Sequence, residues 1–163
     1  MKYKIFLFAL CFFFSIKGLA QKNMNFIKIH GGVEMPLGIF KEGYKTGWGI
    51  YATDYYDVNK DGSVLLSAGI TGWKVQDANN NSGLFLTRVG YRHFVVEGLY
   101  AQGDAGLAVY TGYWKGPSRF TYGGGFGYLI KNKSGNGFDI SARINKASYR
   151  PWIGFNIGYQ FKL

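Results

Sequence analysis

The strict alternation of apolar and polar residues at the end of the chain is the feature that most limits its fold. From Pro151 to Leu163, every second residue is large and apolar, and glycine, amide and lysine residues fill most positions between them. Successive side chains of a β-strand point to opposite faces, so this period of two places the apolar residues on one face. The apolar set is Ile153, Phe155, Ile157, Tyr159, Phe161 and Leu163. The sequence therefore predicts that the chain ends in a two-faced strand.

The same alternation recurs along the chain and predicts an all-β fold of eight strands. Its 25 glycines and 3 prolines suit short strands joined by tight turns. Most of the predicted strands are roughly 9 to 13 residues long, close to the length that a tilted strand needs to cross a bilayer. The predicted strands cover residues 25–35, 47–57, 64–73, 85–95, 101–110, 120–128, 138–145 and 151–163.

Turn and loop residues separate these segments. Residues 59–62, Asn-Lys-Asp-Gly, give a strong turn signal, and the pair at 97–98, Glu-Gly, predicts another tight turn. Loops or longer turns are expected at 41–46, 77–83, 115–118, 131–137 and 146–150. The register of segment 47–57 stays open, because Trp48 and Ile50 share one parity with Asp54.

The start of the chain has the layout of a secretory signal. Two lysines precede an apolar run from Ile5 to Ile16, and small residues surround a cleavage site after Ala20. The run is shorter than the roughly 20 apolar residues that a transmembrane helix needs. We therefore expect a signal peptide at 1–20 and a single barrel domain at 21–163.

Cysteine content and charge narrow the classes of function. The only cysteine, Cys11, lies within the signal segment, so the exported chain would have neither disulfides nor thiolate metal ligands. Without the three lysines of that segment, sixteen basic residues remain against nine acidic ones, a net charge of about +7. The basic residues do not cluster as they would in a nucleic-acid-binding protein. We expect attraction to anionic outer-membrane lipid and lipopolysaccharide instead, and no nucleic acid partner.

The polar parity of the strands favours a barrel with lipid outside over a soluble sandwich. It carries charged residues among glycine, serine and threonine, which suits a narrow lumen where small residues make room for long ones. The predicted interior polar network consists of Lys28, Glu34, Arg88, Arg92, Asp104, Asp139 and Arg143. In a sandwich, the same residues would form the face in contact with water. The predicted fold class is an eight-stranded, antiparallel, up-and-down transmembrane β-barrel after a cleaved signal peptide.

Aromatic residues near the strand ends support this choice. Tryptophan and tyrosine gather where a membrane meets water, because their rings are apolar and their edges are polar. The expected girdle residues are Trp48, Tyr91, Tyr113, Trp114, Tyr149 and Trp152.

The last eight residues resemble the C-terminal signal that the outer-membrane barrel assembly machinery reads. The matching positions are Asn156, Gly158, Phe161 and Leu163, although a final phenylalanine is commoner than leucine. The segments 31–40 and 47–49 are similar to the opening hairpin of the small outer-membrane β-barrel proteins of Bacteroidota, of the OmpA, OmpW and OmpX type. This resemblance implies an outer-membrane location, a barrel fold and contact with the assembly machinery during biogenesis. We also expect the barrel to be a monomer.

We expect no enzymatic activity, cofactor or metal site. The leading hypothesis is a barrel with a side-chain-filled interior and a structural or envelope-maintenance role. A small-solute channel is the alternative, because Gly123, Gly125 and Gly127 form one inward row that could leave space. A lipid A modifying enzyme is less favoured, since neither His30 on the inward parity nor His93 on the outward parity has a serine two residues away.

Overall fold

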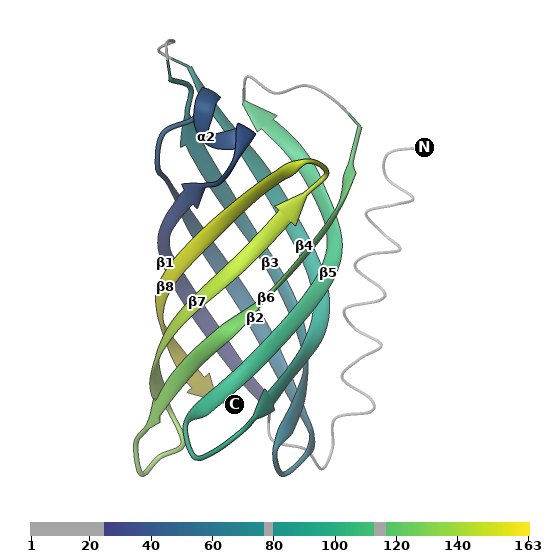
Figure 1. The fold of residues 1–163 in the computed structure, drawn as a ribbon. Helices are drawn as coiled ribbons and strands as arrows, with labels where there is room; N and C mark the ends of the chain where they lie inside the picture. The colour runs from purple at the N-terminus through teal and green to yellow at the C-terminus, as the bar shows by residue number, and fades with distance from the viewer. Residues whose placement is uncertain (1–24, 77–79, 113–116) are drawn as a thin grey trace.

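The protein is a closed barrel of eight antiparallel strands in which each strand pairs with the next in sequence (Figure 1). The computed structural model describes residues 25–76, 80–112 and 117–163. The elements are β1 (Asn25–Pro36), α2 (Ile39–Gly43), β2 (Gly47–Asn59), β3 (Gly62–Lys74), β4 (Asn81–Phe94), β5 (Leu99–Gly112), β6 (Arg119–Lys131), β7 (Gly137–Ala147) and β8 (Arg150–Lys162). The predicted fold class is confirmed, while the predicted signal peptide at 1–20 lies outside the described residues.

Pairing between the first and last strands closes the barrel. The ladder between β1 and β8 runs from Phe26 opposite Lys162 to Pro36 opposite Trp152. Because of this closure, every strand has a hydrogen-bonded neighbour on both sides and the sheet has no free edge. Such closure is what allows a sheet to enter hydrocarbon, where unpaired backbone groups would find no partner.

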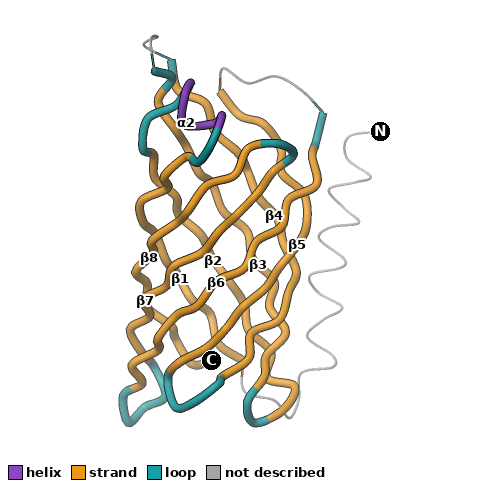
Figure 2. Tube along the Cα trace, viewed as in Figure 1, coloured by secondary structure: helices purple, strands orange, loops and turns teal. Residues whose placement is uncertain are grey.

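The two ends of the barrel differ in how the strands are joined (Figure 2). At the end where β8 stops, only residues 60 and 61 separate β2 from β3, and the predicted turn at 59–62 is confirmed. At the opposite end, the longer connection between β1 and β2 contains α2. We call these the turn end and the loop end.

Two predicted loops at the loop end are partly wrong. Segment 41–46 was expected to be irregular, yet it begins within α2, whose Phe40 side chain is buried and packs with Trp73. Segment 77–83 was also expected to be a loop, but Asn81 pairs with Lys74 and so already belongs to β4. A contact with a distant part of the chain determines the first structure, and pairing within the β3–β4 hairpin determines the second.

Alternation along the strands places apolar side chains on the outer wall. Phe126 and Ile157 are 66% and 64% exposed, whereas the neighbouring inward positions are buried or hold glycine. In β2 the open register is now determined, since Ile50 faces outward and Tyr51 faces inward. Asp54 shares the outward parity near the turn end, where its carboxylate accepts a hydrogen bond of 2.5 Å from the Tyr56 hydroxyl.

No helix in the described part of the chain is long and apolar enough to cross a membrane.

Candidate functional site

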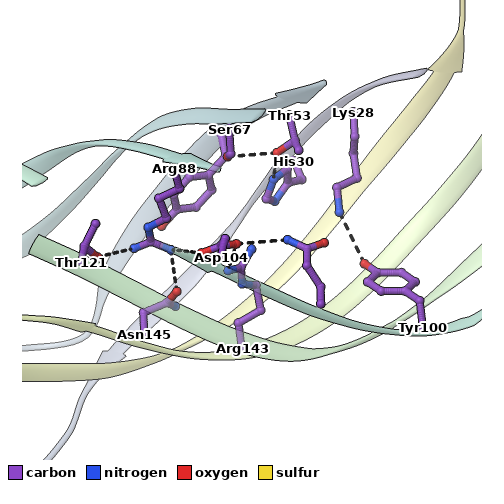
Figure 3. A network of polar contacts seen from close by, with 12 residues as sticks. Lys28, His30, Thr53, Ser67, Arg88, Tyr100, Asp104, Thr121, Arg143 and Asn145 are labelled. Atoms are coloured by element: carbon purple, nitrogen blue, oxygen red, sulfur yellow. Dashed lines mark hydrogen bonds and ion pairs between the residues drawn. The ribbon is translucent and has the colours of Figure 1, made fainter. Parts of the chain in front are cut away.

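The interior of the barrel brings together the charged side chains of the polar parity. Six of the seven predicted network residues are buried as whole residues, and the side chain of Arg143 is 10% exposed. They come from four strands, β1, β4, β5 and β7, and they form separate groups along the lumen. Figure 3 shows part of this network, with side chains from opposite walls directed toward one another.

Asp104 is the centre of the largest group. Its Oδ1 atom lies 3.4 Å from Nη1 of Arg88, and its Oδ2 atom forms an ion pair with Arg143 (Figure 3). The Arg88 guanidinium also donates to Asn145 at 2.7 Å and to Thr121 at 3.1 Å. One carboxylate on β5 therefore links two buried cations, one on β4 and one on β7.

A second group lies nearer the turn end. Lys28 forms a salt bridge of 3.0 Å with Asp139, and both side chains are buried. The Tyr100 hydroxyl donates to the other oxygen of Asp139 at 2.7 Å. Asp139 is thus held by Lys28 of β1 and Tyr100 of β5. Its charged carboxylate can be buried because both partners lie within bonding distance.

Arg92 is held without a salt bridge among the described residues. Its guanidinium carbon lies 3.7 Å from the centre of the Tyr55 ring and 4.8 Å from that of Phe94. One nitrogen donates to the side-chain oxygen of Gln160 at 2.9 Å. Aromatic faces attract a cation through their quadrupole, and this contact replaces the carboxylate that the other buried cations have.

Glu34 is the one acidic residue of the predicted network that forms no salt bridge within the described part of the chain. It accepts a hydrogen bond of 2.8 Å from the Tyr51 hydroxyl. Gly49 and Gly154 flank its carboxylate, and a Cβ at either position would come within 2.7 Å of a Glu34 oxygen. These two glycines make room for the acid, so the sequence pairs small residues with large ones here as expected for a narrow lumen.

The inward glycine row of β6 does not leave an open path. A Cβ on Gly127 would lie 2.3 Å from the Tyr100 ring, and one on Gly123 would lie 2.5 Å from the Asn145 side chain. At Gly125 the nearest side chain is that of Arg143. The space that these glycines provide is therefore occupied by side chains from the two neighbouring strands.

Apolar residues fill the lumen below α2. Phe40 of α2 packs edge-on against Trp73 at 5.1 Å between ring centres, and Trp73 packs against Trp152 at 5.3 Å. Leu84 and Leu86 belong to the same buried cluster, which we call the aromatic plug. A smaller cluster at the turn end consists of Phe26, Tyr55 and Leu65.

The position of Trp152 corrects one prediction. It was expected in an interfacial girdle, but it is fully buried inside the barrel, opposite Asn145 on β7. Its parity is that of the buried polar residues Asn156 and Gln160 of β8, and parity outweighs its closeness to the strand end. Trp48, Tyr91 and Tyr149 do lie on the outer surface, whereas Tyr113 and Trp114 lie outside the described residues.

A small polar cavity lies between the central ions and the aromatic plug. Its volume is about 10 Å³, counted as space for the centre of a water molecule. It is lined by His30, Glu34, Tyr51, Ser67, Leu86, Arg88, Arg143, Asn145 and Asn156. A cavity of this size and polarity accommodates one water molecule and no larger solute.

The two histidines lie apart, as their parities predicted. His30 is buried and bonds the Thr53 hydroxyl at 3.2 Å, and Thr53 in turn donates to Ser67. His93 is exposed on the outer wall beside Tyr91. In the described part of the chain, no three His, Cys, Asp or Glu side chains are arranged to hold a metal ion.

Of the residues that match the assembly signal, Asn156, Gly158 and Phe161 lie in β8, and Leu163 follows its last residue. Asn156 is buried in the lumen, while Phe161 and Leu163 are exposed on the outside. Gly158 pairs with His30 of β1, and a Cβ there would meet the His30 side chain at 2.4 Å.

Several neutral residues of the network were not singled out from the sequence. Tyr51, Tyr100, Gln102 and Asn145 each bond a charged side chain of the network. Their inward parity could have identified them, because each alternates with outward residues of its own strand. Parity does not identify the charged partner of each of these residues, because the partners lie at varied spacings, from 2 to 57 positions away in the sequence.

No family model matches the sequence, and no curated protein matches it either. The chain is similar to Neisserial surface protein A, with 13% identity over 85% of this chain and 97% of that chain and a TM-score of 0.66. It has the fold of a small outer-membrane β-barrel. The Yersinia pestis attachment invasion locus protein Ail, an outer membrane protein, is 19% identical over 86% of this chain and 100% of that chain, with a TM-score of 0.56. A de novo designed transmembrane β-barrel is 13% identical over 86% and 95%, with a TM-score of 0.53.

Proposed function

We propose that the protein is an integral outer-membrane β-barrel with a filled lumen and a structural or envelope-maintenance role. One observation carries this proposal: the outer wall is apolar, while the charged side chains of the network are buried in the lumen. Such a surface would be unstable in water, because exposed apolar area is unfavourable there, and it is suited to acyl chains. The basic outer rim and the apolar wall would contact lipopolysaccharide and lipid as partners, and the barrel would remain a monomer.

The filled lumen favours a closed barrel over the small-solute channel. The ion pairs of Asp104, the aromatic plug and the side chains beside the glycine row occupy the interior. An eight-stranded barrel has an interior just wide enough for side chains to fill. The predicted interior network, from Lys28 to Arg143, then serves to pack and fix the barrel wall.

Planar-bilayer recording tests this proposal. The purified full-length protein is first checked for folding by heat-modifiable gel migration in detergent, and we expect the unheated form to migrate faster. After insertion, we expect no single-channel steps above the baseline. Stable steps of uniform size would contradict the closed lumen and favour the channel.

We also propose that the protein is not an enzyme. His30 bonds the Thr53 hydroxyl, but this pair is buried beside a cavity of about 10 Å³, which is too small to admit an ester substrate. His93 lies on the outer wall beside Tyr91. Mass spectrometry of lipid A from cells with and without the gene should give the same acyl pattern. A changed pattern would instead support a lipid A modifying activity.

The two ends of the chain would direct export and assembly of the barrel. The segment 1–20 would direct export, and Asn156, Gly158, Phe161 and Leu163 would be read by the barrel assembly machinery. A Leu163→Asp variant should then accumulate unfolded in the periplasm, whereas Lys162→Ala should assemble as the unchanged protein does. Normal assembly of Leu163→Asp would argue against this role of the terminus.

A further inference from the structure

A groove on the outer wall lies beside α2 at the loop end of the barrel. Its volume is about 510 Å³. The barrel side of the groove is formed by Met35, Ile153 and Phe155, which face outward from β1 and β8. Pro36 and Leu37 continue this apolar surface toward α2.

Two lysines line the groove on its loop side. Lys41 belongs to α2 and Lys45 follows it, and both are exposed. Neither forms a salt bridge with any described residue, so both ammonium groups are available to an external anion. The nearby Glu42 is also exposed but does not line the groove.

The groove is continuous with the apolar outer wall. Met35 lies next to Ile153 across the β1–β8 ladder, and Val33 lies next to Phe155 in the same direction. The apolar part thus extends down the barrel, while the cations remain at the rim. An apolar surface with cations at its upper end is complementary to a lipid, which has acyl chains below an anionic headgroup.

We propose that this groove binds a lipid A type phosphoglycolipid of the outer leaflet. An acyl chain would lie over Ile153 and Phe155, and a phosphate would lie between Lys41 and Lys45. This inference rests on the proposed membrane location. It also uses the usual orientation of bacterial barrels, whose longer connections face outward, which places α2 at the level of the lipopolysaccharide leaflet.

The proposed contact between the two lysines and the phosphate is tested by native mass spectrometry. The detergent-purified barrel is titrated with hexa-acylated lipid A. The variant Lys41→Ala with Lys45→Ala should bind about 30-fold more weakly, because each cation near a membrane surface contributes roughly a fivefold factor. The matched control, Lys60→Ala with Lys133→Ala, removes two exposed charges at the turn end and should change binding less than about twofold.

The acyl half is tested with the same titration. Phe155→Ala removes a ring that lines the groove. We expect it to weaken binding several-fold, because the acyl chain loses the apolar surface of this ring as a contact. Phe126→Ala removes a ring of similar exposure from β6, outside the groove, and should leave binding unchanged.

Three results would overturn the proposal. The first is that the double lysine variant binds lipid A as tightly as the unchanged protein does. The second is that lipid A without its phosphates binds as tightly as intact lipid A. The third is that phosphatidylglycerol displaces bound lipid A as well as added lipid A does. Heat-modifiable migration is recorded for every variant. A barrel that fails to fold in detergent contradicts the proposed function itself, whereas a folded barrel with unselective lipid binding contradicts only the groove.

Discussion

The lumen is filled in two different ways at two levels. Below α2, the rings of Phe40, Trp73 and Trp152 pack edge to face. At the centre, Asp104 joins the guanidinium groups of Arg88 and Arg143. Apolar packing depends on volume and tolerates gradual change, whereas a buried ion depends on each partner and becomes costly when one is lost. The two levels should therefore fail differently under substitution.

Asp104→Ala should have the largest effect, since it leaves two buried cations without their carboxylate. We expect a loss of about 3 to 5 kcal/mol in the free energy of unfolding. Urea unfolding in lipid vesicles, followed by tryptophan fluorescence, measures this loss. Asp61→Ala, in the exposed turn between β2 and β3, is the control and should change stability by less than about 0.5 kcal/mol.

A compensating variant sharpens this result. Replacing Arg88, Asp104 and Arg143 together by methionine, leucine and methionine removes the ions and keeps most of the volume. Such replacements of buried ion groups are often neutral, so the triple variant should be more stable than Asp104→Ala. If the triple variant is the less stable of the two, the cost does not come from unpaired charge.

Trp152→Ala probes the aromatic plug and should cost about 3 kcal/mol, because a large buried ring is removed. Trp152→Phe should recover much of this loss, a graded response that the ionic level should lack. The same unfolding assay applies, with Trp48→Ala on the outer wall as the control. A loss no greater than that of Trp48→Ala would mean that the plug contributes little.

Gly127→Ala tests how tightly the lumen is packed beside the glycine row. The new methyl group would meet the Tyr100 ring, and we expect a loss of about 2 kcal/mol from overpacking. Gly103→Ala is matched to it, since only one atom lies within 4 Å of the new Cβ, at 3.9 Å. Equal stability of the two variants would indicate free space in the lumen and would renew the case for a channel.

Tyr100→Phe should have the smallest effect, about 1.5 kcal/mol, from loss of the hydrogen bond to a charged acceptor. Lys28 still pairs with Asp139 in this variant, so the carboxylate is not left alone. Thermal unfolding monitored by circular dichroism is sensitive enough to compare it with Tyr128→Phe on the outer wall. An effect as large as that of Asp104→Ala would mean that Tyr100 and Lys28 act as one unit.

Parity along each strand was sufficient to predict the wall of the barrel from sequence. It identified the outward apolar residues, such as Ile157, and the inward charges, such as Arg88, because side-chain direction in a strand depends only on position. The residue that pairs with each buried charge could not be predicted from the sequence. Arg88 meets Asn145 only because the register of every strand between β4 and β7 brings them together.

Two errors have different origins. Trp152 was assigned to the interface from its closeness to a strand end, although its parity already placed it inside, where it packs against Trp73. Helix α2 has only five residues, too few to be stable by itself, and the insertion of Phe40 into the barrel mouth holds it. That second contact leaves no signal in the local sequence.

The ladder between β1 and β8 makes the wall complete only when the last strand has arrived. Without β8, one edge of β1 and one edge of β7 would be left unpaired. The first and last strands therefore depend on each other for their stability, although they are the two strands farthest apart in the sequence.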